Sequence, residues 1–335
     1  MSDRKAASLA FLANAGWADA SRSFLAGDAS DRSYDRLRRG TKTAVLMDAP
    51  PGKGDDPADF IAIGAHLNRL GLSAPRVLAQ DLAQGFLLIE DLGDDVFAGL
   101  IAKEPQREVE LYAAATDVLT HLQSHPAPKD LPDLSAMDWA KAAAFALDWY
   151  RFAVTGNRVD TQPFVATLTR LIQHHADGPR VLILRDYHAE NLLWLPERSG
   201  TARVGLLDFQ LGQMGQPGYD LVSLLQDARR DVSVGIEVEM IQRFRPDMSG
   251  DFLTSYAVLG AQRGFRILGI FARLCLVAGK PHYVTLIPRV WQYLQRNLRH
   301  PALAPLATIC NIQLPEPTPE ALERIRAQCG KHPMP

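Results

Sequence analysis

Hydrophobic and polar positions follow two different periods along this chain of 335 residues. Up to residue 92, short runs of alternating polar and apolar residues predict antiparallel strands, and one stretch between them has apolar residues at helical spacing. After an opening helix, the predicted strands are residues 21–27, 34–40 and 41–50 and two more within 75–93, with a helix at 57–71. The pattern therefore predicts a small antiparallel sheet with a helix before its last two strands.

Helical periodicity dominates the chain from residue 105 onward. Two short strand-like segments, 179–186 and 203–210, interrupt it. A chain of this length is longer than a single hydrophobic core usually supports, so two lobes are expected. We predict an α+β protein with a small antiparallel-sheet lobe over residues 1–92 and a larger, mainly helical lobe over residues 93–335.

Composition and charge narrow the class of partner. The formal net charge of -2 and the pI of about 6.5 argue against a nucleic-acid surface, which usually has a basic balance. The most apolar stretch, 267–279, contains Arg273 and is too short to span a membrane. The 3 cysteines have neither metal-site nor disulfide spacing and fit a reducing cytoplasm. We expect a cytoplasmic monomer whose partner is a small molecule.

The polar block at residues 185–191 is the clearest sign of chemistry. It interrupts an apolar segment and lacks the Gly, Pro or Asn-Gly residues of a solvent-facing turn. Asp186 follows one strand-like segment, Asn191 lies five residues later, and Asp208 follows the other segment. If the two segments pair, these side chains converge, and their oxygens suit Mg²⁺ and the orientation of a hydroxyl. Either aspartate alone is more typical of a cap, whereas the three residues together favour a site.

The motifs LRDYHAEN and LLDFQ resemble the catalytic loop and the metal-binding segment of kinases. Because His188 lies two residues after Asp186, the pattern is similar to that of the aminoglycoside-phosphotransferase-like small-molecule kinases. The stretches GDASDRSYDRL, VLMDAPP, GFLLIEDLG and LGIFARL are most similar to the bacterial anomeric kinases for N-acetylmuramate and N-acetylglucosamine in cell-wall recycling. The resemblance implies a bilobal protein-kinase-like fold.

The same resemblance implies ATP and Mg²⁺ as cofactors and an amino sugar as the phosphate acceptor. Asp186 would be the catalytic residue that accepts or orients the proton of the attacking hydroxyl. Asn191 and Asp208 would hold Mg²⁺ against the ATP phosphates. Phosphoryl transfer depends mostly on positioning and charge stabilisation, so these three residues would supply much of what the reaction needs.

The part of the pattern that binds ATP departs from the family. Its members usually carry a lysine on the third strand and a glutamate on the next helix, but Met47 stands at the lysine position and helix 57–71 has no glutamate. Either the protein is a pseudokinase that binds without turnover, or the polar segment 27–33 holds the phosphates, with Ser30, Arg32 and Ser33 as candidates. The presence of all three catalytic-site residues favours an active enzyme.

Adenine recognition is expected at the segment that follows the last predicted strand. Such kinases bind adenine there through backbone groups, and the candidates in this chain are Glu90, Asp91 and Leu92. Met47 could form one face of the adenine slot, although an apolar side chain is equally reasonable as core.

Candidates for acceptor binding are Arg185, His188, Glu190, Tyr150, Arg151 and Arg263. Each of the better-defined ones has a simpler alternative: His188 can brace the loop, Tyr150 can be core, and an arginine can form an ordinary ion pair. Asp220 is better interpreted as a helix cap than as a third metal ligand. Kinases of choline, homoserine or an aminoglycoside, and a pseudokinase module, remain the alternative functions.

Overall fold

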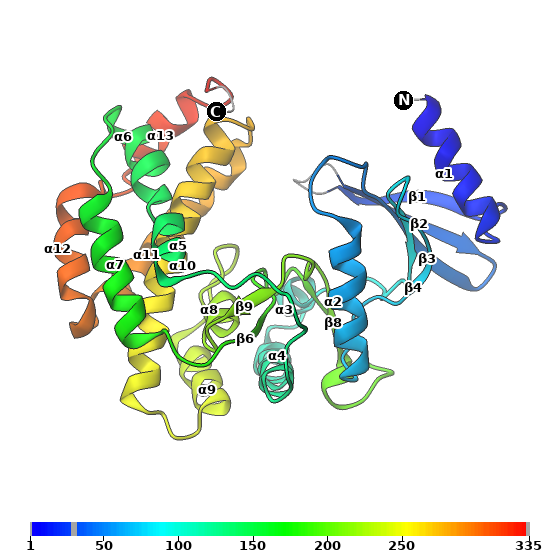
Figure 1. Cartoon of the computed structure of the whole chain (residues 1–335), viewed down its shortest axis with the longest axis horizontal. Coiled ribbons are helices and arrows are strands. Elements are labelled where there is room, and N and C mark those ends of the chain that lie inside the picture. Colours follow the sequence, from blue (N-terminus) through cyan, green and yellow to red (C-terminus); the bar gives the residue numbers. More distant parts are fainter. Residues whose placement is uncertain (1, 28–31, 333–335) are drawn as a thin grey trace. The chain divides into compact units, whose positions relative to one another are not determined.

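The computed structural model describes residues 2–27 and 32–332. The chain forms two compact units, one of Met1–Asp130 with Leu184–Gln213 and one of Leu131–Ile183 with Met214–Pro335 (Figure 1). The segment that carries the predicted catalytic loop therefore belongs to the same unit as the N-terminal sheet. The division into lobes at residue 92 stays a prediction.

A five-stranded antiparallel sheet in the order β1-β2-β3-β5-β4 forms the N-terminal part of the first unit. Its strands are β1 (Ser21–Gly27), β2 (Ser33–Arg39), β3 (Lys42–Asp48), β4 (Val77–Asp81) and β5 (Phe86–Ile89). Helix α2 (Pro57–Arg69) lies between β3 and β4 in the chain. This order confirms the predicted small antiparallel sheet with one inserted helix.

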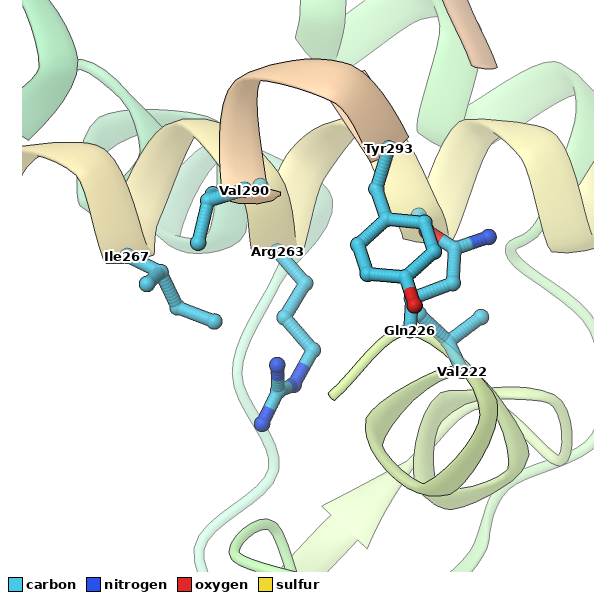
Figure 2. A pocket seen from close by; sticks show the side chains of 8 residues that line it. Val222, Gln226, Arg263, Ile267, Val290 and Tyr293 are labelled. Carbon is cyan, nitrogen blue, oxygen red and sulfur yellow. The ribbon is translucent and has the colours of Figure 1, made fainter. Parts of the chain in front are cut away.

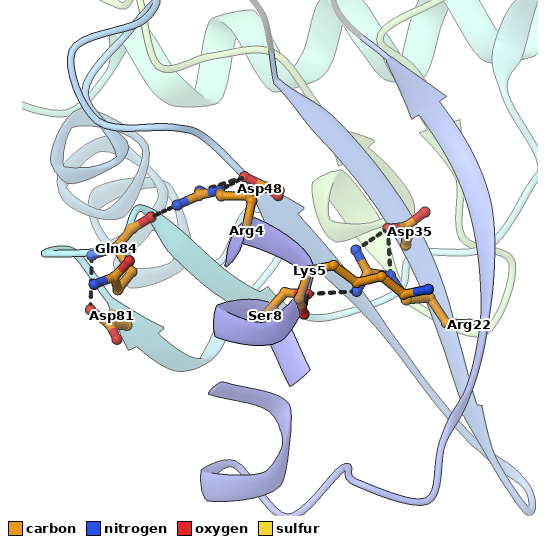
Figure 3. Close-up of polar contacts among 8 residues, drawn as sticks. All are labelled: Arg4, Lys5, Ser8, Arg22, Asp35, Asp48, Asp81 and Gln84. Atoms are coloured by element: carbon orange, nitrogen blue, oxygen red, sulfur yellow. Dashed lines mark hydrogen bonds and ion pairs between the residues drawn. The ribbon is translucent and has the colours of Figure 1, made fainter. Parts of the chain in front are cut away.

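Helix α1 (Ser2–Asn14) is fixed to the sheet by arginine side chains from both partners (Figure 3). Arg4 of the helix donates from Nε to Asp48 Oδ1 of β3 at 2.9 Å. Arg22 of β1 donates from Nη1 to Ser8 Oγ of the helix at 2.9 Å. These contacts place the apolar side of α1 against one face of the sheet.

The continuous apolar run Ala44–Met47 of β3 is buried, with side chains on both faces of the sheet. Leu46 packs with Phe86 and with Phe11 of α1 on one face. Val45 and Met47 alternate with it and are buried toward the opposite face. Full burial of such a side chain contributes about 1.5–3 kcal/mol, so β3 is a main source of the sheet's stability.

Helix α2 holds the segment that carries Asp208. Asp56 caps the helix, its carboxylate accepting the backbone N–H of Ala58 at 2.9 Å. The Phe60 ring stacks on that of Phe209 with centroids 4.8 Å apart. A Cβ at position 64 would lie 3.3 Å from the Phe209 ring, so glycine permits this close packing.

The first unit continues with α3 (Phe97–Lys103), α4 (Glu108–Gln123) and the paired strands β7 (Leu192–Trp194) and β8 (Val204–Leu206). The two strand-like segments at residues 179–186 and 203–210 do not pair with each other. Instead β8 pairs with β7, and β6 (Val181–Ile183) pairs with β9 (Gln213–Gly215). The apolar residues that follow the polar block form the separate strand β7, which brings the block and β8 together.

The second unit is mainly helical. Its elements include α5 (Ala136–Ala143), a π-helical turn (Ala146–Arg151), α6 (Phe152–Thr155), α7 (Gln162–His175), α8 (Tyr219–Leu225), α9 (Val234–Phe244), α10 (Gly250–Leu276), α11 (Ile287–Leu298), α12 (Ala304–Gln313) and α13 (Pro319–Ala327). The long helix α10 packs against α5, α7, α8 and α11 (Figure 1). Within the part of the chain that the structure describes, no helix is long and apolar enough to cross a membrane.

Candidate active site

The polar block forms a loop whose backbone is fixed by its own residues and by α4. The side chain of Asn191 donates from Nδ2 to the carbonyl oxygen of Asp186 at 2.9 Å. Its backbone N–H donates to the carbonyl oxygen of His188, also at 2.9 Å. Tyr187 is buried, and its hydroxyl donates to the carbonyl of Ala115 in α4 at 2.8 Å. The half-buried Asp186 is therefore presented by a loop that is braced on both sides.

Asp208 is connected to this loop through the backbone. The N–H of Leu207 donates to the carbonyl of Asn191 at 3.0 Å, which sets Asp208 beside the loop. Asp208 itself has a φ of 55°, a left-handed conformation that costs energy for a residue other than glycine. Such strained residues are concentrated at functional sites, and here the conformation is held by packing of the next residue, Phe209, against α2.

A cavity of about 400 Å³ in the first unit joins the sheet to this loop. Its apolar lining includes Leu25, Val45, Phe60, Ile89, Leu193 and Leu207, and its polar lining includes Tyr34, Glu90, Asp94, Glu190, Asn191 and Asp208. A mostly apolar cavity with a few polar groups in its lining is typical of a small-molecule site. Tyr34 and Val45 were not predicted, although Val45 lies two residues before Met47 and so faces the same side of β3.

The hinge candidates are held by arginines. Glu90 and Leu92 line the cavity, and Asp91 forms an ion pair with Arg36 of β2 at 2.9 Å. Arg36 also donates to Asp94 at 2.7 Å, so one guanidinium connects β2 to both ends of the hinge. The Glu90 carboxylate accepts from Arg198 at 2.7 Å, and the Glu90 N–H donates to a backbone carbonyl.

The four candidates for the phosphate side have different surroundings. Ser30 lies outside the described residues, and Ser33 is the first residue of β2. Met47 is fully buried. Arg32 is buried with its Nη2 3.4 Å from Asp208 Oδ1 and 3.4 Å from Asp55 Oδ2.

Asn191 and Asp208, which both line the cavity, fit a magnesium ion. The Asn191 amide nitrogen donates to Asp186, which leaves the amide oxygen as the atom for a metal. Asp208 adds a carboxylate on the same cavity. Among the described residues no cluster of three or more His, Cys, Asp or Glu could hold a metal. Two protein oxygens suit Mg²⁺, because this ion keeps several waters and binds substrate phosphates.

The acceptor candidates of the first unit lie on the catalytic loop. Arg185 has a φ of 70° and is half-buried, His188 is buried with Nε2 3.4 Å from Asn191 Nδ2, and Glu190 is exposed and lines the cavity. These positions agree with loop bracing for His188 and with ligand contact for Glu190.

The acceptor candidates of the second unit are more enclosed. Tyr150 is fully buried, its hydroxyl donates to the carbonyl of Pro315 at 2.8 Å, and burial raises the pKa of the phenol. Arg151 donates to the carbonyl of Asn157 at 2.5 Å. Arg263 of α10 is buried and donates to Ser223 Oγ at 2.7 Å. It lines a cavity of about 10 Å³ (Figure 2), which is room for one water molecule at most.

The antiparallel sheet, the helical region after it and the Asp186, Asn191 and Asp208 set define a phosphotransferase with a protein-kinase-like fold. The chain belongs to the phosphotransferase enzyme family, whose model matches residues 21–250. Membership of this family confirms the predicted fold class and the prediction of an enzyme.

Curated relatives extend the similarity over nearly the whole chain. An N-acetylmuramate/N-acetylglucosamine kinase of Caulobacter vibrioides is 40% identical, with 91% of this chain and 95% of that protein covered. A kinase of the same name from Pseudomonas aeruginosa is 32% identical, with 84% and 85% covered. The predicted resemblance to kinases of N-acetylmuramate and N-acetylglucosamine is thereby confirmed.

Solved structures agree in fold at low sequence identity. A microcompartment-associated aminopropanol kinase superposes with a TM-score of 0.60 at 15% identity, covering 90% of this chain and 99% of that one. An ADP-bound aminoglycoside phosphotransferase superposes with a TM-score of 0.57 at 13% identity, covering 86% and 97%.

Proposed function

We propose that the protein transfers the γ-phosphate of ATP to the anomeric hydroxyl of an N-acetylated amino sugar, N-acetylmuramate or N-acetylglucosamine, and so makes a sugar 1-phosphate for cell-wall recycling. The observation that carries this proposal is the 40% identity to a kinase of these sugars over 91% of the chain. The reducing cytoplasm expected from the sequence suits this reaction, and the expected monomer stays a prediction.

In this reaction Asp186 accepts or orients the proton of the attacking hydroxyl. A positioned general base contributes about 10²- to 10⁴-fold to such a step. Its position depends on Asn191, which holds the Asp186 carbonyl, and on Tyr187, which fixes the loop to α4. The loop thus keeps the carboxylate at a fixed place while the substrates bind and leave.

Asn191 and Asp208 would hold Mg²⁺, which neutralises charge on the phosphates when it is bound. Adenine would occupy the apolar part of the cavity, between Val45 and Leu207, with Glu90 and Leu92 of the hinge at its edge. The phosphates of the nucleotide would then extend toward Asn191 and Asp208, which line the same cavity.

For the acceptor, we propose Arg185 and Glu190 as the loop residues that contact the sugar. Arg185 directly precedes Asp186, and Glu190 follows it by four residues in the same loop. Arg263, Tyr150 and Arg151 stay predictions from the sequence. Arg263 and Tyr150 are buried within the second unit, where they donate hydrogen bonds to Ser223 and to the carbonyl of Pro315.

Phosphorus NMR tests the reaction and its position together. Purified protein is incubated with ATP, Mg²⁺ and one acceptor at a time: N-acetylglucosamine, N-acetylmuramate, choline, homoserine or an aminoglycoside. The expected result is a new phosphate resonance, coupled to the anomeric proton, with the two sugars. Turnover with another alcohol would replace the sugar by that acceptor, and ATP binding with no product in any tube would favour the pseudokinase.

A further inference from the structure

The lysine–glutamate pair that the resemblance leads one to expect has no counterpart at its usual positions. Met47 is fully buried and pairs in register with Tyr34 of β2 and Leu87 of β5. Because Tyr34 lines the cavity, Met47 belongs to the sheet face on the cavity side. Met47 therefore has the location of such a lysine but carries no charge.

A buried arginine lies at the same end of the sheet, where β2 begins and β3 ends. Arg32 precedes Tyr34 by two residues, just before β2, and its side chain is 3% exposed. Its Nη2 atom lies 3.4 Å from Asp208 Oδ1 and 3.4 Å from Asp55 Oδ2. A buried guanidinium is stable only with such anionic partners, so this contact is a built part of the site.

Gln210 completes the connection between the two acids. Its Nε2 donates to Asp208 Oδ1 at 2.9 Å and to Asp55 Oδ2 at 3.3 Å. Asp55 directly precedes the cap of α2, the helix on which the family glutamate is expected. Both members of the expected ion pair thus have substitutes nearby: Arg32 from the connection between β1 and β2, and Asp55 from the entrance of α2.

We propose that Arg32 binds the phosphates of the nucleotide and that Asp55 holds it there, so that this ion pair replaces the missing lysine–glutamate pair. The inference rests on the proposed ATP-dependent function. A guanidinium has five donors in a planar fork, so Arg32 can keep Asp55 while it contacts a phosphate. When Asp208 binds a metal, Asp55 remains as the partner that keeps Arg32 at the site.

Binding of adenosine, ADP and ATP to the full-length chain, measured by titration calorimetry without any acceptor, tests the proposal. For Arg32→Met we expect ATP affinity to fall about 10- to 100-fold, the loss typical of one charged hydrogen bond, while adenosine affinity is unchanged. Arg32→Lys should restore part of the loss. Asp55→Asn should weaken ATP binding in the same direction, and the double variant should lose less than the sum of the two.

The matched controls are Arg38→Met, at an exposed arginine of β2, and Asp56→Asn, which keeps the cap of α2. Neither should change ATP affinity. Repeating the titrations in EDTA separates direct phosphate contact, whose effect persists without metal, from an action through the metal site, whose effect disappears and would overturn the proposal.

Two further outcomes distinguish this inference from the proposed function. If the unaltered protein binds none of adenosine, ADP and ATP, the ATP-dependent function fails. If it binds ATP and Arg32→Met binds it equally well, the function stands and the role of Arg32 is wrong. Equal losses for adenosine and ATP, together with a lower melting temperature, would show that Arg32 is structural and would also overturn it.

Discussion

The catalytic loop and the end of the sheet near Met47 belong to the same unit, but they hold their functional groups in different ways. In the loop, Asp186 and Asn191 are five residues apart and are joined by a hydrogen bond from the Asn191 side chain to the Asp186 backbone. At the end of β2 and β3, Arg32 comes from the β1–β2 connection and Asp55 from the β3–α2 connection, and the two meet through their side chains alone.

This difference reflects what each group must do. A proton acceptor acts at hydrogen-bond distance from one atom, so its backbone position is tightly constrained. A positive charge near phosphates acts over a longer range and can come from any side chain that reaches the site. The chain therefore retains the spacing of the loop and, under our proposal, supplies the charge from a different strand connection.

The largest expected effect is that of Asp186→Asn. Asparagine keeps the size and most hydrogen bonds of the side chain but cannot accept the proton, so kcat should fall about 10²- to 10⁴-fold. Affinity for ATP should change little, because the loop is held by Asn191 and Tyr187 through groups that remain. Steady-state kinetics with the sugar, together with calorimetry for ATP, measure the two quantities separately.

The control for that experiment is Asp247→Asn, which removes an exposed carboxylate of the second unit. It should leave both quantities unchanged. Unaltered turnover of Asp186→Asn would remove this residue from the mechanism, whereas an equal loss of ATP binding would show that the substitution had disturbed the loop.

Arg36→Met tests the hinge and should have an intermediate effect. The side chains of Arg36 and Asp91 are 9% and 6% exposed, so the variant leaves a buried carboxylate without its cation. Breaking such a pair costs about 3 kcal/mol in the free energy of unfolding. Unlike Arg32→Met, it should weaken adenosine and ATP binding equally, since the hinge faces the adenine part of the cavity.

Urea denaturation and calorimetry check both expectations. Adding Asp91→Asn to Arg36→Met should recover part of the stability, because the buried charge is then removed from both sides. A variant that lost ATP affinity but kept adenosine affinity would place Arg36 at the phosphates and weaken the assignment of Arg32.

The sequence predicts the sheet and the loop better than it predicts the pairing around them. Alternating runs such as 21–27 coincide with β1, because each carries its own periodic pattern. The pairing considered for the segment before Asp186 does not occur, because β6 pairs with β9. The apolar residues Leu192–Trp194 form the strand that pairs with β8, and no local pattern distinguishes that choice from the alternative.

The site shows the same limit. The proximity of Asp186, Asn191 and the segment that carries Asp208 could be predicted, because each is a hydrophilic residue next to an apolar segment. Arg32 was one of three candidates in its segment, and its contact with Asp55 depends on two connections that approach each other only in the fold. Val45 was missed because a residue that lines an apolar cavity has the same pattern as core.

The smallest effect is expected at Met47, the position where related kinases carry the lysine. Met47→Leu conserves volume and should cost less than about 1.5 kcal/mol, with ATP affinity changed less than about twofold, because the position carries no charge to the site. Met47→Lys should instead lower the melting temperature, since burying an ammonium among residues such as Tyr34 and Leu87 is costly. If Met47→Lys kept its stability and raised ATP affinity, the site would still have use for a charge on β3, and the replacement by Arg32 would be incomplete.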